Sequence, residues 1–216
     1  CPLVIPLGEG YSMERLASAL GNPARAGMLP PVPYGWAGSG LRIKESVLGA
    51  LLGNLLASLR DDGFSRPLAL TPQGIDLGLG SASIAIFHPS HPHASETFQP
   101  PDEQRGKVIL LPVGHIEQHA YHLPMSTDTL IVDAIGQGTA AAVPEQAWAL
   151  ATMPYGVSTH RASFAGTLNC GGRAFEDFWL EVIDLLAGRG FDRLYLINGH
   201  GGNHSFLVNV LKYARE

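Results

Sequence analysis

The chain has 216 residues, and 45% of them are apolar, so it can bury a substantial core and is not a disordered protein. The formal net charge of −5, the pI near 6.0 and the lack of a Lys/Arg cluster argue against nucleic acid and anionic membrane surfaces as partners. The longest apolar stretch, residues 47–59, is interrupted by Gly and Asn and is too short to span a bilayer of roughly 30 Å. With only two cysteines and no visible secretory signal, the sequence predicts a soluble protein of the cytoplasm.

Three short segments of the first half are met again, in the same order, in the second half. Residues 3–8 (LVIPLG), 30–35 (PPVPYG) and 55–70 (LLASLRDDGFSRPLAL) correspond to residues 109–114 (ILLPVG), 151–156 (ATMPYG) and 182–197 (VIDLLAGRGFDRLYLI). Three matches in one order favour an internal duplication over coincidence.

The two copies differ where the second carries polar side chains. From Gly8 to Tyr34 the first copy has 26 positions, whereas from Gly114 to Tyr155 the second copy has 41, a difference of 15. The first copy also has a glutamine opposite His200, and an amide cannot replace an imidazole as a good transition-metal ligand. We therefore interpret the chain as a degenerate, non-catalytic copy at residues 1–75, an inter-copy segment with a possible strand at residues 76–106, and a metal-binding copy at residues 107–216.

Strands and helices alternate in the second half. Strands are predicted at residues 107–114, at 147–154, and from residue 192 into a glycine turn. Helices are predicted at residues 128–140, 173–190 and 205–216. The second of these helices has the clearest apolar spacing, and the first gathers Leu130, Ile131, Ala134 and Ile135 on one face. Buried strands that alternate with helices predict an α/β protein with a parallel, doubly wound, three-layer α/β/α sheet.

The loop after the strand at residues 107–114 concentrates possible metal ligands. Glu117 and His119 are two positions apart, so on an extended segment both side chains project to the same side. Asp128 lies where the loop enters a helix, whose positive end favours a carboxylate that could bridge two cations. His200 follows another strand, and parallel strands share the edge at which they end. These oxygen and nitrogen donors suit two divalent ions (Zn²⁺, Mn²⁺ or Fe²⁺) that activate water.

The residues that carry this pattern resemble those of a known family. LPVGHIEQHAYHLPMSTDT, MPYGVSTHRASFAGTLN and LINGHGGN are similar to three consecutive signatures of the creatininase (creatinine amidohydrolase) family, over about residues 107–216. The resemblance implies hydrolysis of a C–N bond in a small cyclic amide, a formamide or a peptide-like substrate at a two-metal centre. It also implies that the metal ligands are Glu117, His119, Asp128 and His200, and that His160 contacts the substrate or the reacting water.

Two positions depart from the family pattern. Ala120 stands where family members usually have glycine. The fifth ligand of the family is a glutamate, which in creatininase itself lies two residues after the histidine equivalent to His200, but Gly202 stands there in this chain. HASET at residues 93–97 is similar to a shortened form of the segment that supplies this glutamate in other relatives, so Glu96 is a candidate for the missing ligand.

Other polar residues near these motifs have less definite roles. His115 and His122 are interpreted as neighbours of the ligands or plain loop residues, with His122 a candidate for substrate contact. Tyr155 is interpreted as a core residue or a substrate contact. Cys170 lies near the expected pocket, but without a partnered base it is not predicted to be a nucleophile. The histidines at residues 88, 91 and 93 are interpreted as members of an exposed loop, with adventitious metal binding as the alternative.

Three functions are compatible with this sequence. The first is a metal-dependent amidohydrolase in which Glu117 and His160 take part in catalysis. The second is a catalytically impaired pseudoenzyme or assembly subunit, because one copy lacks ligands and the other lacks the fifth. The third is a biosynthetic enzyme that runs the same chemistry in reverse. Resemblance to the family also implies a homo-oligomer, commonly a hexamer, although the internal pair could replace a subunit contact.

Overall fold

A computed structural model describes residues 1–88, 100–159 and 163–214 of the chain. Its strands are β1 (Pro2–Pro6), β2 (Gly27–Met28), β3 (Arg66–Pro72), β4 (Ser83–Ile86), β5 (Val108–Val113), β6 (Ala147–Ala149) and β7 (Leu194–Asn198). Its α-helices are α1 (Met13–Ala19), α2 (Glu45–Asp61), α3 (Thr127–Ala142), α4 (Gly172–Gly188) and α5 (His204–Tyr213). Single 3₁₀ turns occupy η1 (Gly80–Ala82), η2 (Asp102–Gln104) and η3 (Gly201–Asn203).

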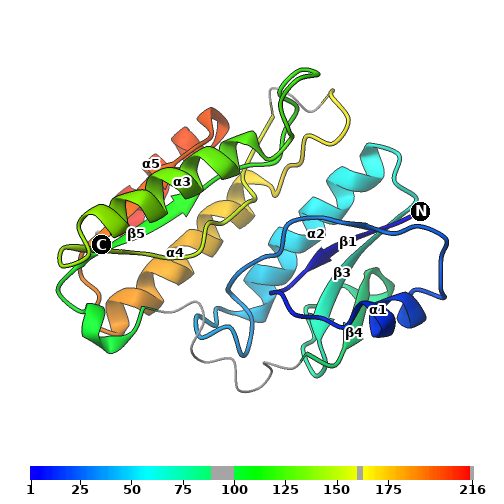
Figure 1. Ribbon diagram of the computed structural model, residues 1–216, viewed down its shortest axis with the longest axis horizontal. Helices are drawn as coiled ribbons and strands as arrows, with labels where there is room; N and C mark the ends of the chain where they lie inside the picture. Colours follow the sequence, from blue (N-terminus) through cyan, green and yellow to red (C-terminus); the bar gives the residue numbers. More distant parts are fainter. Residues whose placement is uncertain (89–99, 160–162, 215–216) are drawn as a thin grey trace.

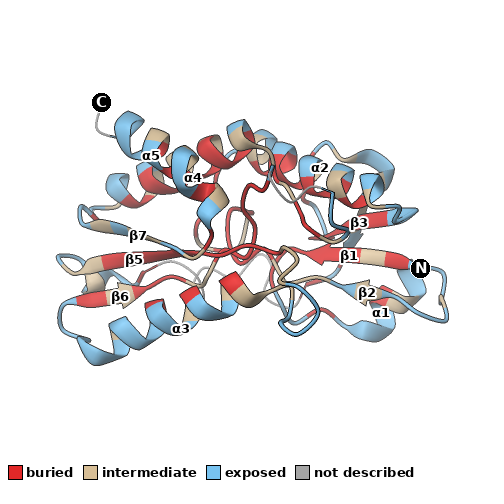
Figure 2. Ribbon diagram, turned by 90° about the horizontal axis from the view of Figure 1, so that it is seen from above, coloured by how far each residue is buried: buried red, intermediate tan, exposed pale blue. Residues whose placement is uncertain are grey.

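The strands form two parallel sheets rather than one. The first has the strand order β2-β1-β3-β4 and the second β6-β5-β7, and every paired strand is parallel to its neighbour. In Figure 2 the strands form a middle layer, with α2, α4 and α5 on one side and α1 and α3 on the other. The predicted α/β class with parallel, helix-covered sheets is therefore confirmed, and the division into two sheets is the difference.

The two halves have backbone hydrogen bonds at equivalent positions. The amide of Gly8 donates to the carbonyl of Val32 over 2.9 Å, and the amide of Gly114 donates to the carbonyl of Met153 over the same distance. In both sheets the first strand lies between the second and the third. This is the arrangement that a duplication would leave, and the duplication itself stays a prediction.

Both halves contribute to one hydrophobic core. Helix α2 of the first half packs beside α4 of the second, as Figure 1 shows at the centre of the molecule. The ring of Tyr34 lies 6.1 Å from that of Phe178 and 6.4 Å from that of Trp179, so aromatic side chains from both halves interlock. Lys44 forms an ion pair with Glu181 across the same boundary. The two halves are thus packed against each other through α2 and α4.

Helix α4 has the amphipathic pattern that its sequence predicts. Six apolar side chains at three-to-four spacing are buried in the core: Phe175, Phe178, Trp179, Val182, Ile183 and Leu186. Helix α3 differs from this. The side chains on its apolar face remain 57%, 53% and 52% exposed at Leu130, Ile131 and Ile135, whereas Val132 and Gly136 pack against the sheet. A face that looks like a core face in the sequence is therefore uncovered in the single chain.

Some predicted boundaries shift in the structure. The strand predicted at residues 147–154 is regular only over β6, and beyond it Met153 makes an isolated bridge to Val113. The possible strand of the inter-copy segment is present as β4. It ends at Ile86 and pairs in parallel with β3 at the edge of the first sheet. His88, predicted to be exposed, is buried against the rings of Tyr11 and Trp36, whereas residues 91 and 93 lie outside the described part. None of the helices in the described ranges is long and apolar enough to cross a membrane.

Candidate metal centre

The segment that follows β5 carries three polar side chains of the site, those of His115, Glu117 and His119. It runs beside residues 166–168: the amide of Leu168 donates to the carbonyl of Ile116 over 3.0 Å, and the amide of Gln118 donates to Oγ1 of Thr167 over 3.2 Å. A further hydrogen bond joins the amide of Glu117 to the carbonyl of Met125 over 3.0 Å. These hydrogen bonds hold the backbone of residues 116–118 in place. The side chains at alternate positions, 115, 117 and 119, belong to the cluster.

Asp128 and His200 reach the same place from two other elements. Asp128 lies in the first turn of α3, where the unpaired amides of the helix favour a carboxylate. His200 follows β7, and its amide donates to Oδ1 of Asn198 over 3.1 Å. Its Nδ1 atom lies 2.9 Å from Oδ2 of Asp128 and 3.3 Å from Oε1 of Glu117. On the other side, Nε2 of His119 lies 3.1 Å from Oδ1 of Asp128. The structure thus brings together the four predicted ligands.

The hydrogen bonds of His119 and His200 to backbone carbonyls indicate which ring nitrogen carries the hydrogen and which carries the lone pair. In His119, Nδ1 lies 3.1 Å from the carbonyl of Glu117, to which it can only donate, so a neutral ring has its lone pair on Nε2. In His200, Nε2 lies 3.1 Å from the carbonyl of Val157, so the lone pair is on Nδ1. Both lone pairs then face carboxylate oxygens of Asp128. Acceptors that face acceptors need a proton or a cation between them, and this donor set suits a transition metal.

The charges of the cluster shift the pKa values of its members. Burial alone would raise the pKa of Asp128, but the hydrogen bond and charge of His200, with the charge of His119, outweigh it and hold this pKa below its usual value. Burial would lower the pKa of His200, but the hydrogen bond that the ring donates to Asp128 and the charges of Glu117 and Asp128 raise it. Both shifts favour a proton on His200 beside the ionised carboxylate of Asp128.

His115, which the sequence analysis interprets as a neighbour of the ligands or a plain loop residue, lies in the cluster. It is fully buried, and His115, Glu117 and His200 each offer one ligand atom within 4.8 Å of the others. Burial, followed by the charge of His200, lowers the pKa of His115 to about 3, so the ring is neutral. The alternation that places Glu117 and His119 on one side also includes residue 115, and this pattern was the available sign.

Two polar side chains support the cluster without having been predicted. The Oγ of Ser158 donates to Oε2 of Glu117 over 3.3 Å. Asn203 is fully buried, accepts the amide hydrogen of Val157 over 2.9 Å and donates to the carbonyl of Gly114 over 3.2 Å. Asn203 therefore ties the end of β5 to the backbone beside His200. A final asparagine in a glycine turn was its only sign in the sequence.

The two departures from the family pattern have structural consequences. Ala120 has a φ of +57°, a left-handed conformation that glycine adopts without strain and alanine does not. At Gly202, an added Cβ would lie 2.3 Å from the carbonyl oxygen of Val157 and 2.4 Å from Nε2 of His200. A side chain at residue 202 is therefore incompatible with the present position of His200.

The remaining candidates lie away from the cluster or outside the described residues. Tyr155 is fully buried and its hydroxyl donates to the carbonyl of Pro30 over 2.5 Å. Cys170 is equally buried, its thiol donates to the carbonyl of Gly156, and burial raises its pKa. Neither side chain has exposed surface for a substrate, so both are core residues here. His122 is exposed in the loop before α3 and is not a member of the cluster. Residues His160 and Glu96 lie outside the described part of the chain.

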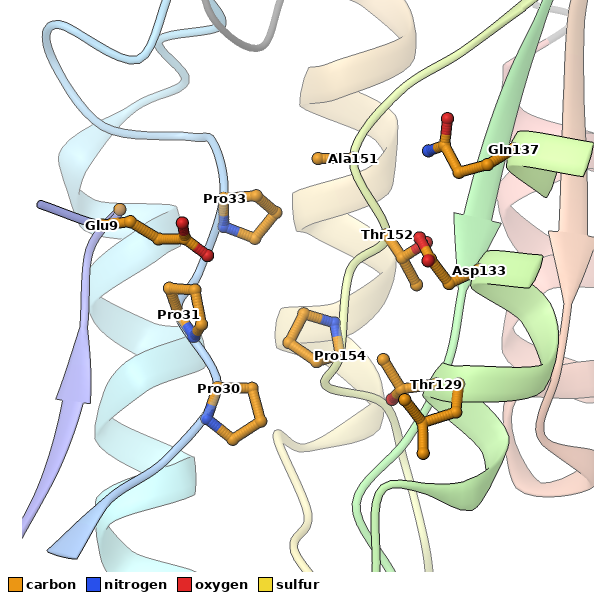
Figure 3. A pocket seen from close by; sticks show the side chains of 12 residues that line it. Glu9, Pro30, Pro31, Pro33, Thr129, Asp133, Gln137, Ala151, Thr152 and Pro154 are labelled. Carbon is orange, nitrogen blue, oxygen red and sulfur yellow. The ribbon is translucent and has the colours of Figure 1, made fainter. Parts of the chain in front are cut away.

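A cavity of about 390 Å³ lies between the two halves, next to the first turns of α3. Figure 3 shows Glu9 and three prolines of the first half, Pro30, Pro31 and Pro33, opposite Asp133, Thr152 and Pro154 of the second. None of the four predicted ligands lines this cavity. The carboxylate of Asp133 accepts a hydrogen bond from Thr152 over 2.7 Å. The cavity is thus a separate feature from the cluster.

Comparisons with known proteins match the region that contains the cluster. The family profile described as "Creatininase: Creatinine amidohydrolase" matches residues 94–216. A mycofactocin precursor peptide peptidase of Mycobacterium ulcerans (strain Agy99) is 39% identical over 118 residues, which cover 50% of this chain and 45% of that protein. A creatinine amidohydrolase of Pseudomonas putida is 32% identical over 112 residues, which cover 50% of this chain and 42% of that protein. The solved structure "Creatininase Mn" is 31% identical and covers 50% of this chain and 44% of that chain, with a TM-score of 0.48. The matched region therefore spans less than half of each relative.

Proposed function

The chain belongs to the creatininase family, whose profile matches more than half of its residues, and on this premise we propose that it is a metal-dependent amidohydrolase. The bond that it cleaves is the C–N bond of an amide. The observation that carries this proposal is the convergence of Glu117, His119, Asp128 and His200, in which the lone pairs of two imidazoles face carboxylate oxygens.

We propose that this cluster holds two divalent metal ions. One position is bounded by His119, Glu117 and Oδ1 of Asp128, and the other by His200, Glu117 and Oδ2 of Asp128. Because the two oxygens of Asp128 face different histidines, this carboxylate is suited to bridge the two ions. The nitrogen and oxygen donors, without a thiolate, favour Zn²⁺, Mn²⁺ or Fe²⁺.

The chemistry follows from what the side chains do around these ions. When bound, the ions supply polarisation of the amide carbonyl and a lower pKa for the reacting water. The chain's own residues orient the reactants: backbone carbonyls hold the rings of His119 and His200. The carboxylate of Glu117, whose Oε2 accepts a hydrogen bond from Ser158, would hold the ions and is also our candidate to accept a proton from the reacting water and return it to the leaving nitrogen. His160 remains our candidate for substrate contact.

For the substrate we propose a small cyclic amide, a formamide or a peptide-like amide. Two relatives support this range, because their names give creatinine and a precursor peptide as substrates. Exposed apolar side chains in the segments that flank the cluster, at Tyr121, Leu123 and Phe164, favour a substrate with an apolar part. His122 in the same loop keeps the role of a proposed substrate contact.

We propose that residues 1–75 form a non-catalytic copy that supports the second half. Both groups of metal-ligating side chains found among the described residues lie in the second half. Contacts from α2 and its C-cap residue Asp62 support this role: Asn54 donates to the carbonyl of Cys170 over 2.9 Å, and Asp62 accepts the amide hydrogen of Gly166 over 2.7 Å. The exposed apolar face of α3 supports association into a homo-oligomer.

The second candidate function is a catalytically impaired member of the family that acts as an assembly subunit. The specific observation in its favour is Gly202: the resemblance to creatininase itself would put the fifth ligand at this position, but a Cβ there would clash with Val157 and His200. This candidate predicts that little or no metal binds at the cluster.

Metal analysis separates the two candidates. The protein is purified without added metal, incubated with Zn²⁺, Mn²⁺ or Fe²⁺, dialysed and analysed for metal content, and then assayed against creatinine, formamides and short peptides. We expect about two equivalents of metal per chain. His200→Ala should lose metal and turnover while the circular dichroism spectrum is retained, and His122→Ala, outside the cluster, should keep its metal. Full activity of His200→Ala, or a wild-type protein that binds no metal after reconstitution, would overturn the proposal.

A further inference from the structure

His115 differs from the two predicted histidine ligands in the direction of its hydrogen bond. The amide of Gly156 donates to Nδ1 of His115 over 3.0 Å, so the lone pair of Nδ1 is already engaged. Because a neutral imidazole has one N–H, the hydrogen is on Nε2. In His119 and His200 the N–H group points to a backbone carbonyl and the lone pair points into the cluster. His115 has the opposite arrangement and offers the cluster no free lone pair.

The ring of His115 instead lies against the ring of His200. The two ring centroids are 4.2 Å apart and the planes are inclined by 31°. Both rings are almost completely inaccessible to solvent. His115 therefore covers one face of the imidazole whose Nδ1 atom meets Asp128 and Glu117.

Two consecutive backbone residues bind the two rings, one ring each. Gly156 binds His115 through its amide, and Val157 binds Nε2 of His200 through its carbonyl. This segment is in turn held by Asn203, which accepts the amide hydrogen of Val157. The approach is so close that a Cβ at residue 156 would lie 2.2 Å from Oδ1 of Asn203, which explains the glycine. One hydrogen-bonded backbone segment thus contacts both rings.

From this geometry we propose that His115 is a positioning residue, not a metal ligand, and that its ring holds the imidazole of His200 in the orientation that presents Nδ1 to a metal. The inference rests on the metal centre of the proposed function. It concerns a residue that directs a ligand through ring packing, in the way that groups around a metal site orient the ligands they contact.

The test compares two substitutions that separate the ring from its nitrogens. His115→Asn keeps an acceptor near the position of Nδ1 for the amide of Gly156 but removes the ring face. His115→Phe keeps a flat ring against His200 but has no nitrogen that could bind a metal. Each folded variant and the wild-type protein are titrated with Co²⁺, and affinity, stoichiometry and the visible absorption spectrum of the bound cobalt are measured.

We expect His115→Asn to bind Co²⁺ about 10- to 100-fold more weakly with an altered cobalt spectrum, because His200 is released. His115→Phe should keep the wild-type stoichiometry and spectrum, with a loss of less than about tenfold. Loss of a metal equivalent in His115→Phe would identify His115 as a ligand and overturn the inference, as would an unchanged affinity and spectrum in His115→Asn. A wild-type protein that binds no Co²⁺ would overturn the proposed function, and this inference with it. Binding by the wild type leaves the proposed function standing whatever the variants show.

Discussion

The Nδ1 atom of His200 lies 2.9 Å from Oδ2 of Asp128, although the two residues come from the end of β7 and the first turn of α3. The lowered pKa of Asp128 and the raised pKa of His200 both favour a protonated His200 beside an ionised Asp128. The pKa of Asp128 is lowered, so its contribution to stability is present above the unfolded value of about 3.9 and is lost as the pH falls further. The pKa of His200 is raised, so its contribution is present below about 6.5 and is lost as the pH rises.

We therefore expect the metal-free protein to gain most from this pair between about pH 4 and pH 6.5. The measurement is the difference in free energy of unfolding between the wild-type protein and His200→Gln, by urea denaturation at a series of pH values. His115 has a pKa lowered to about 3, so its protonation favours unfolding as the pH falls. Because both proteins contain His115, this effect is reduced in the difference between them. A difference that does not change between pH 5 and pH 9 would contradict the expectation.

Metal binding should have the opposite pH dependence, because a cation needs the lone pair of His200 that the proton occupies. Below the raised pKa of His200, the apparent affinity for Zn²⁺ should increase by about tenfold per pH unit for one displaced proton. Calorimetric titration in buffers of different ionisation enthalpy measures the protons released. An affinity for Zn²⁺ that does not depend on pH would show that His200 does not compete with protons for the metal.

Replacement of Ala120 by glycine should stabilise the protein. The φ of +57° at this position is strained for alanine, so Ala120→Gly should raise the free energy of unfolding by about 1 kcal/mol. Ala134→Gly, an exposed position within α3, is the matched control and should lower it by about 1 kcal/mol. Chemical denaturation of both variants tests the prediction, which fails if the two substitutions change stability in the same direction.

The hydrogen bond between Asp62 and Gly166 should stabilise residues 166–168, which lie beside the backbone of residues 116–118. Asp62→Ala removes the acceptor of the 2.7 Å hydrogen bond and should lower the free energy of unfolding by about 1 to 2 kcal/mol. Hydrogen exchange should accelerate at Gly166, Thr167 and Leu168, which lie beside the backbone of residues 116–118. Asp61→Ala changes an exposed neighbour and serves as the control. Equal exchange in the two variants would mean that α2 does not hold this segment.

Gly202→Ala should disturb His200 although it adds only one methyl group. The added Cβ would lie 2.4 Å from Nε2 of His200, so either the ring or the backbone must move. We expect the free energy of unfolding to fall by about 1 to 3 kcal/mol and metal affinity to fall with it. At Gly201 an added Cβ meets no atom within 4 Å, which makes Gly201→Ala a close control. Thermal unfolding and zinc titration of both variants provide the measurement.

The sequence by itself determined the class of the fold and the four proposed ligands. Apolar strands that alternate with amphipathic helices have few ways to bury their surfaces, and a parallel α/β arrangement follows from that pattern. Glu117 and His119 could be paired because the period of an extended chain is two. Asp128 and His200 could be placed with them because parallel strands share the edge where they end. These are local or topological rules, so they can be read along the chain.

Only the tertiary structure decided which polar residues serve the site indirectly and which are core. His115 and Asn203 are hydrogen-bonded to residues that are remote in sequence, and Tyr155 and Cys170 are buried by packing between the two halves. The exposed face of α3 has the same spacing as a core face, and Ala120 gives no local sign of its left-handed backbone. Burial and hydrogen-bond direction depend on what arrives from elsewhere in the fold, and periodicity carries no information about that.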